Sequence, residues 1–274
     1  MPCKNCNIKL VSDSAFCHKC GAKIIEKRLT IRNLMQHLGE TFFNYDNKLL
    51  KTIICLCKAP EAVIDSYVQG VRKRYINPIS FFGISLTLTG FSIFIIKKFY
   101  KNALDASQLF DTSEMYNNEA SQSIMASSAD FSLEYSSLIY ASMIPIFAFI
   151  SWILFTNKRY NFTEHLVSYM YSMSLYSITS VILGLFVLVI APSYYLMFGM
   201  YLYIVVLLYH CFLLKRLFKL SVRELLLKTL LFLIIFFFLF IGISVVGGII
   251  WAIVMHLNGD LETMIEAQKA AQGG

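Results

Sequence analysis

The sequence predicts an all-α integral membrane helical bundle of about five transmembrane helices, preceded by a small N-terminal zinc ribbon. Of its residues, 57% are hydrophobic and 15% are charged, whereas soluble domains carry about 25% charged residues. The apolar residues also gather in five blocks that are long enough to cross a bilayer as helices. Finally, two Cys-x-x-Cys pairs stand close together at the N-terminus.

The predicted spans lie at about 79–96, 136–155, 166–190, 194–214 and 229–256, and none of them contains Asp, Glu, Lys or Arg. They define a membrane domain over residues 79–256. A polar, acidic loop at 97–135 separates the first two spans, and a polar tail at 257–274 follows the last. The first 30 residues are polar and lack an apolar stretch, so we expect no cleavable signal peptide.

The distribution of charge predicts the orientation of the chain. Segments 1–78, 156–165 and 215–228 hold 20 of the 24 Lys and Arg residues and 8 of the 17 Asp and Glu residues, a net charge of +12. The remaining parts hold 4 basic and 9 acidic residues, a net charge of −5. Because loops rich in Lys and Arg stay in the cytoplasm, we expect a multi-pass protein of the inner membrane. Its N-terminus is then cytosolic and its C-terminus outside.

The cysteine-rich head spans residues 1–24. Its motif is Cys3-x2-Cys6-x10-Cys17-x2-Cys20, and four thiolates in two such pairs are typical of a closed, tetrahedral structural zinc site. A segment this short cannot bury enough surface to fold alone, so we expect the metal to fold it. Two disulfides are the alternative in an oxidising compartment, and a four-cysteine site can also hold iron.

The head is basic, and this raises the question of its partner. The basic residues in it and directly after it are Lys4, Lys9, Lys19, Lys23, Lys27 and Arg28. Contact with a cytosolic protein is the favoured interpretation, an inert structural cap is the second, and nucleic-acid binding is the least favoured.

Residues 25–78 form a predicted cytosolic amphipathic helical segment. Apolar residues recur with helical spacing at 31–42 and 49–57, and again after Pro60, which suits the first turn of a new helix. Such helices either lie in the membrane interface or pack against the cytosolic loops. Arg72, Lys73, Arg74 and Tyr75 precede the first span and are candidates for contact with lipid or a partner.

Two stripes stand out within the predicted spans. Polar residues on the third span share one helical face: His165, Ser168, Ser172, Tyr176 and Thr179. Polar groups in lipid need partners, so this face is expected to point inward, either to bond to other helices or to line a small-molecule path. On the fifth span, the small residues Ser244, Gly248 and Ala252 predict a close helix contact, within the chain or in a homo-oligomer.

The sequence gives little support to an enzyme. It contains no His-Glu-x-x-His motif, no Gly-x-Ser-x-Gly elbow and no phosphate-binding loop. Glu164 and His165 at the entrance of the third span are the one pair that an acid–base reaction could use. No Asp, Glu, Lys or Arg lies in a span, and His210 and His256 lie near span ends rather than at the midplane, so a proton-coupled pump is not favoured.

The chain resembles a bacterial family of membrane proteins of unknown function that is common in Bacteroidota, domain of unknown function 3667. The matching residues are Cys20-Gly21, Arg28-Leu29-Thr30, Pro60, Tyr67, Gly70, Arg72, Arg74, Tyr75, Pro78 and Glu164-His165. The chain departs from the family at Glu61, where Gly often follows the proline. The resemblance implies a cytosolic zinc ribbon and a multi-pass membrane domain, without an established reaction.

These observations predict a non-enzymatic scaffold or adaptor whose head recruits cytosolic proteins to the membrane. The alternative is a channel or facilitator that uses the polar face of the third span. An enzyme built around Glu164 and His165 ranks third.

Overall fold

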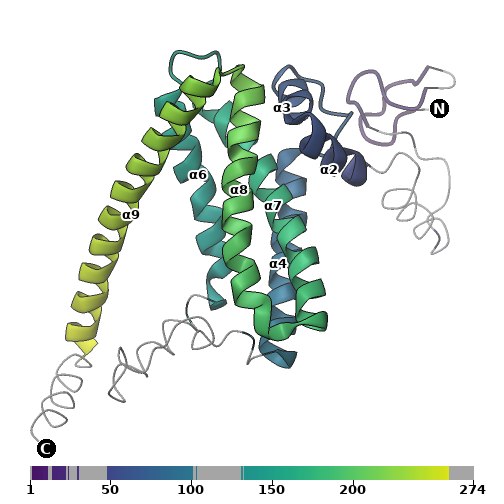
Figure 1. The fold of residues 1–274 in the computed structure, drawn as a ribbon. Helices are drawn as coiled ribbons and strands as arrows, with labels where there is room; N and C mark the ends of the chain where they lie inside the picture. Colours follow the sequence, from purple (N-terminus) through teal and green to yellow (C-terminus); the bar gives the residue numbers. More distant parts are fainter. Residues whose placement is uncertain are drawn as a thin grey trace, which may run out of the picture. The chain divides into compact units, whose positions relative to one another are not determined.

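The computed structural model describes residues 2–11, 14–22, 24, 30, 48–100, 103, 131 and 133–258. The chain divides into two compact units, Met1–Asn47, which holds the cysteine head, and Lys48–Gly274, which holds the helices labelled in Figure 1. Three sequence predictions lie outside the described residues. They are the apolar helix face at 31–42, most of the loop 97–135, and the tail from residue 259.

The predicted all-helical membrane bundle is confirmed. Among the described residues, five helices are long and apolar enough to cross a membrane. They are α4 (Pro78–Phe99), α6 (Ser136–Leu154), α7 (Phe162–Ile190), α8 (Tyr195–Phe218, preceded by the 3-10 turn Pro192–Tyr194) and α9 (Val222–Asn258). Helix α7 packs against α4, α6 and α8, while α9 packs against α6 and α8 (Figure 1). The protein is therefore a multi-pass membrane protein with α7 at its centre.

Local capping fixes where the membrane helices begin. Asn77 accepts a hydrogen bond from the backbone N–H of Ser80 (2.7 Å), and Pro78 occupies the first position of α4. At the start of α7, Asn161 accepts from the N–H of Glu164 (3.0 Å) and the Glu164 carboxylate accepts from the N–H of Asn161 (2.7 Å). Such reciprocal bonds satisfy backbone donors that a helix start leaves without partners.

Two short helices, α2 (Lys48–Lys58) and α3 (Pro60–Val68), pack against the bundle at the end that we call the α3 end. Val63 and Ile64 of α3 are fully buried, in one apolar cluster with Phe155. The apolar face of α3 therefore packs against the membrane helices. The opposite end of the bundle, where α4 ends and α8 begins, is the distal end.

Two ion pairs hold α3 in place. The Arg216 guanidinium of α8 lies 2.6 Å from a Glu61 carboxylate oxygen. The Arg159 guanidinium, from the connection between α6 and α7, lies 2.6 Å from Asp65, which also accepts a hydrogen bond from the hydroxyl of Tyr160. Residues some 95 to 155 positions apart in sequence are thus joined at the α3 end. Glu61 thus pairs its carboxylate with a basic residue of α8.

Candidate functional site

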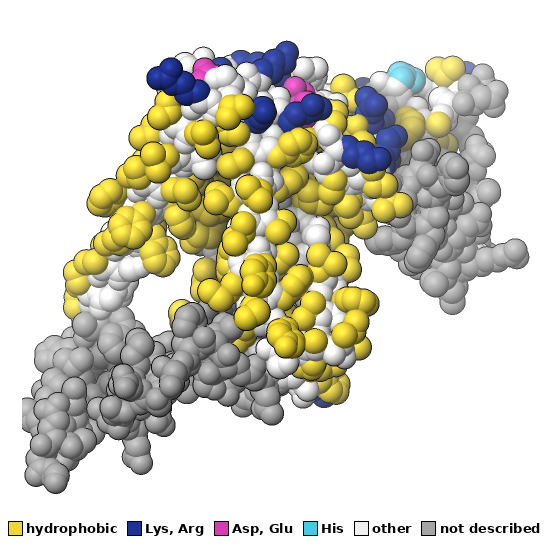
Figure 2. Space-filling view, in the orientation of Figure 1, with side chains coloured by type: hydrophobic (Ala, Val, Ile, Leu, Met, Phe, Trp, Pro, Cys, Tyr) yellow, Lys and Arg dark blue, Asp and Glu magenta, His cyan; other side chains and the backbone are white. Residues whose placement is uncertain are grey.

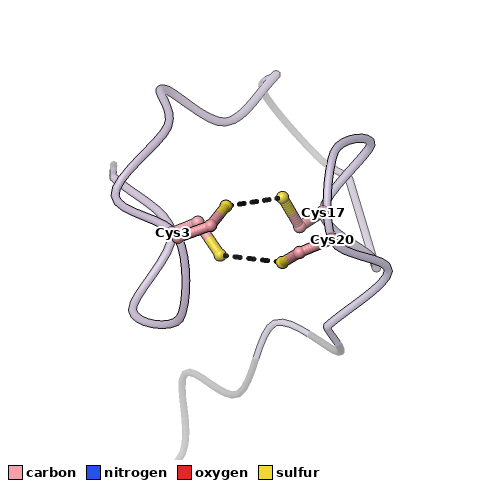
Figure 3. Close-up of side chains that lie close together, drawn as sticks. Cys3, Cys17 and Cys20 are labelled. Carbon is pink, nitrogen blue, oxygen red and sulfur yellow. Dashed lines mark hydrogen bonds between the residues drawn. The ribbon is translucent and has the colours of Figure 1, made fainter.

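The four cysteines of the head come together as the candidate metal centre. Their sulfur atoms all lie within 4.8 Å of one another. The sulfur atoms of Cys3 and Cys20 are 3.7 Å apart, and those of Cys6 and Cys17 are 3.6 Å apart (Figure 3). Cys3 and Cys17 are buried, and the structure forms no disulfide between these thiols. The cluster could therefore hold a metal ion.

Two backbone turns of the same design present the cysteines. In the first, the N–H of Asn7 donates to the carbonyl of Cys3 (2.8 Å), and in the second the N–H of Gly21 donates to that of Cys17 (2.9 Å). Asn7 (φ 56°) and Gly21 (φ 69°) both adopt left-handed conformations. Glycine does so freely and asparagine tolerates it better than most residues. Asn7 and Gly21 thus hold equivalent places in the two turns.

Hydrogen bonds from the turns favour thiolates in the head. The Asn5 side chain and the backbone N–H of Ala22 lower the pKa of the Cys20 thiol to about 6. Backbone N–H groups of Cys6 and Asn5 likewise lower the pKa of Cys3. A lowered pKa raises the share of thiolate, which is the form that binds a metal.

The pKa of the Cys6 thiol is shifted in the opposite direction. The backbone N–H of Ile8 lowers its pKa, but burial and the three neighbouring cysteines together raise it far above the usual value of a thiol. Crowded thiols oppose one another's ionisation because like charges repel. A bound cation removes this repulsion, so the cluster is suited to release its remaining protons when a metal enters.

The predicted polar face of α7 points inward over most of its length. His165, Ser168 and Ser172 are buried, and Tyr176 is partly buried and lines a cavity in the distal half of the bundle. Thr179 is exposed, contrary to expectation.

The reason for this difference is that α7 is buried on nearly every side in its first half but on one side only towards the distal end. There the buried residues are Ser177, Val181, Gly184 and Leu188, which lie on the side of the helix away from Thr179. The sequence pattern of polar residues could not indicate where the burial of the other side ends.

Some buried polar groups of α7 bond to neighbouring helices, whereas Ser168 donates to the carbonyl of Glu164 in its own helix (2.8 Å). The Nδ1 atom of His165 lies 3.0 Å from the Ser151 hydroxyl of α6. The Nε2 atom of His210 on α8 lies 3.1 Å from the Ser172 hydroxyl, and its Nδ1 lies 2.8 Å from the carbonyl of Val206. Because a carbonyl only accepts, Nδ1 carries the proton and Nε2 accepts from Ser172. These contacts match the interhelical bonding interpretation of the polar face.

Glu164 and His165 do not form a joint acid–base site. The hydrogen bond described for the Glu164 carboxylate belongs to the cap of α7, where it accepts from the N–H of Asn161. His165 is 1% exposed and its Nδ1 faces Ser151, while its Nε2 has no hydrogen-bond partner among the described residues. The two side chains therefore serve a helix cap and a helix contact.

The basic group before the first span divides into exposed and buried parts. Arg72, Lys73 and Arg74 are exposed, and the Arg74 guanidinium lies 5.5 Å from the centre of the Tyr75 ring. Tyr75 itself is 6% exposed and belongs to the cluster beneath α3. The surface that lipid or a partner could contact is thus confined to the three basic residues.

The small-residue stripe of α9 has no partner among the described residues. Ser244 and Gly248 are exposed, and no atom lies within 4 Å of where a Cβ on Gly248 would stand. The side chain of Ala252 lies outside the described residues. Of the two contacts expected here, the one within the chain is not formed by Ser244 or Gly248.

Comparison with known proteins gives one match. A family model described as a protein of unknown function (DUF3667) matches residues 46–90. This stretch covers α2, α3 and the first half of α4, the elements that build the α3 end. No curated protein and no solved structure matches the chain. The similarity therefore supports an uncharacterised family and carries no activity.

Proposed function

We propose that the protein is a membrane-anchored adaptor whose zinc-bound head contacts a cytosolic protein. The four-cysteine cluster is the observation that carries this proposal. Zn–S bonds of about 2.3 Å in a tetrahedron place sulfur atoms about 3.8 Å apart, close to the 3.6 and 3.7 Å separations in the head. Bound zinc would act structurally here, since all four ligand positions are cysteines.

The surface of the head supports protein contact. Phe16 is 51% exposed and Val11 is 63% exposed, on a unit with few residues to form a core. Lys4, Lys9 and Lys19 are exposed on the same unit. Aromatic anchors bordered by charge are typical of binding sites for proteins. A partner with an acidic surface and an apolar pocket fits this chemistry best.

The charge of the α3 end supports a cytosolic location for the head. In Figure 2, dark blue Lys and Arg side chains gather over the α3 end of the membrane unit. A basic end placed against the anionic cytosolic leaflet follows both the topology rule and lipid electrostatics. We therefore propose an inner-membrane protein with the α3 end in the cytosol and the distal end outside.

The helical unit is better suited to anchoring than to transport. A transport path along the polar face of α7 would have to pass His165 and Ser172. Both are buried and bonded to α6 and α8. Rings of Phe155 and Phe218, stacked 4.5 Å apart, lie beside His165. Facilitated transport is thus the less favoured function.

Photo-crosslinking in cells tests the adaptor role. A photoreactive phenylalanine analogue at Phe16 of the full chain should give a discrete crosslinked product with one protein. Cys17→Ser should abolish this product at unchanged membrane level, since the head loses its metal. The same analogue at Phe91, exposed on the membrane helix α4, is the control and should give no such product. No product at Phe16, or one that survives Cys17→Ser, would contradict the proposal.

Two further measurements test the metal site and the membrane orientation separately from the contact with a partner. Elemental analysis should find about one zinc per chain in the parent and none in Cys17→Ser; retention of metal in the variant would exclude the assigned ligands. For orientation, a cysteine introduced at Ser121 in a background without native thiols should react with an impermeant maleimide in spheroplasts. One at Asn157 should not, and the reverse pattern would overturn the orientation.

A further inference from the structure

The distal half of the bundle contains a cavity that the adaptor role does not use. It has a volume of about 290 Å³ and is lined by α4, α6, α7 and α8. At about 30 Å³ per water molecule, it has room for roughly ten waters. This volume lies at the small end of the range for ligand pockets, so it suits a small molecule or the head of a larger one.

Glycine on α8 helps to keep this space open. Gly199 lines the cavity, and no atom lies within 4 Å of where its Cβ would stand. On α7, a Cβ on Gly184 would stand 3.3 Å from the ring of Tyr195, so that aromatic ring packs directly on the α7 backbone. Gly199 is therefore a position in the lining where a larger side chain can be introduced without first displacing a neighbour.

The lining of the cavity is rich in hydroxyl groups and carries no charge among the described residues. Its hydroxyl-bearing side chains include Thr89, Ser92, Tyr140, Tyr176, Ser177 and Ser180. Burying an ion without a countercharge is costly, so anions and cations are both poor ligands for this site. An uncharged polar ligand suits it.

Several lining hydroxyls already donate their protons to the protein. Thr89 donates to the carbonyl of Ser85 (2.9 Å), and Ser180 donates to that of Ser177 (2.9 Å). Tyr140 donates to a backbone carbonyl of α7. A hydroxyl has one proton and two acceptor positions. Thr89 already accepts from the Ser177 hydroxyl (2.8 Å), so it retains one acceptor position beside those of Ser180 and Tyr140. The matching ligand is one that donates hydrogen bonds through its own O–H groups.

The apolar part of the lining sets a second requirement for the ligand. Ile93 of α4 and Phe198 and Leu202 of α8 line the cavity beside the hydroxyls. A ligand with hydroxyls on a short hydrocarbon skeleton meets both surfaces. We propose that this cavity binds an uncharged polyol of the glycerol type, as a free molecule or as the head of a neutral lipid. The head of a neutral lipid and a free polyol would bind through the same hydroxyl groups. They differ in their route, since the lipid enters from the bilayer and the free polyol from water.

Binding to the purified full-length protein in detergent tests the site. The probes are radiolabelled glycerol and 1-monolauroylglycerol, and saturable binding of either at one per chain is expected. Binding of the lipid alone would assign the site to a lipid head, and binding of glycerol would assign it to a free polyol. The monolauroylglycerol phosphate analogue should bind at least ten-fold more weakly, because none of the described residues that line the cavity is basic.

Paired variants tie the binding to the cavity. Gly199→Leu should weaken binding at least ten-fold by filling the space, whereas Gly90→Leu, at an exposed glycine outside the cavity, should not. Tyr176→Phe with Ser180→Ala removes two hydroxyls without adding volume and should also weaken binding. Its control is Thr87→Val with Tyr201→Phe, both exposed residues outside the lining.

The proposal is overturned if neither probe binds the parent protein saturably. It is also overturned if the hydroxyl-removing variant binds like the parent, or if the phosphate analogue binds as tightly as the neutral probe. Because the hydroxyl variant keeps the helices packed as they are, its result stands even if Gly199→Leu does not fold. None of these results depends on the metal or on a partner of the head.

Discussion

Helices α7 and α9 show how differently two spans of one bundle can be used. The most apolar stretch of α9 has a mean hydropathy of 3.0, and none of it is buried. The corresponding stretch of α7 has a lower mean hydropathy of 2.3, and 39% of it is buried. In a soluble protein the more hydrophobic helix would be expected at the centre.

The physical reason for this reversal is the solvent. Lipid chains are as apolar as leucine, so hydrophobicity gives a membrane helix no preference for its neighbours over lipid. Helices associate through close packing and through polar groups that need partners. Helix α7 supplies both, with buried serines and with His165. Helix α9 contacts the bundle mainly near its start, as where Phe232 and Phe236 pack on Phe147, and then diverges (Figure 1).

The comparison predicts that removing a ring from α7 costs far more than removing one from α9. Tyr171 is 1% exposed and its hydroxyl donates to the carbonyl of Ile76 (2.6 Å). Tyr171→Ala should lower the free energy of unfolding by about 3–5 kcal/mol, because it leaves a cavity. Phe237→Ala, at a residue 59% exposed on α9, should change it by no more than about 0.5 kcal/mol. Denaturant unfolding in detergent measures both, and equal losses would break the comparison.

A smaller effect is expected from the polar contact between α7 and α8. Ser172→Val removes the donor to His210 Nε2 and leaves that buried atom without a partner. The free energy of unfolding should fall by about 1–2 kcal/mol. Ser244→Val, the same change on the exposed face of α9, is the matched control. Should both variants unfold like the parent, the serines of α7 would not explain its central place.

The ion pair between α3 and the connection before α7 should contribute less to the free energy of unfolding than the contact between α7 and α8. Asp65→Asn removes the charge that pairs with Arg159, whose side chain is 62% exposed. Partly exposed pairs are screened by water, so the loss should be about 1 kcal/mol or less. Hydrogen exchange should nevertheless quicken in α3 and remain unchanged in α9. High salt should reproduce the effect in the parent and add little in the variant; faster exchange throughout the bundle would refute a local role.

The smallest effect is expected at Gly248 of α9. Gly248→Leu should leave the unfolding of the monomer in detergent within about 0.5 kcal/mol of the parent, because no described atom lies near this position. A loss of 1–3 kcal/mol, typical of overpacking, would mean that α9 packs by this face within the chain. A change in oligomeric size without a change in monomer stability would place the stripe between two copies.

The sequence by itself determined the elements of this protein. Blocks of apolar residues are sufficient to locate the membrane helices, since the bilayer sets their length. Two Cys-x-x-Cys pairs predicted the metal ligands, because each pair folds as a local turn that holds its two sulfur atoms together. Asn77 and Pro78 set the start of α4, because a capping residue acts on the backbone a few positions away. These features depend on neighbours in the sequence.

Only the tertiary structure decided which faces meet. It placed Tyr75 in the core and Thr179 on the surface, joined Glu61 to Arg216, and left Gly248 without a neighbour among the described residues. It also gathered hydroxyls from four helices around one cavity, though no helix alone carries a pattern that reveals it. A membrane span carries apolar residues on all of its sides, because lipid as well as protein favours them. The periodicity of apolar residues therefore does not identify the side that packs against other helices. Contacts between distant helices make that choice.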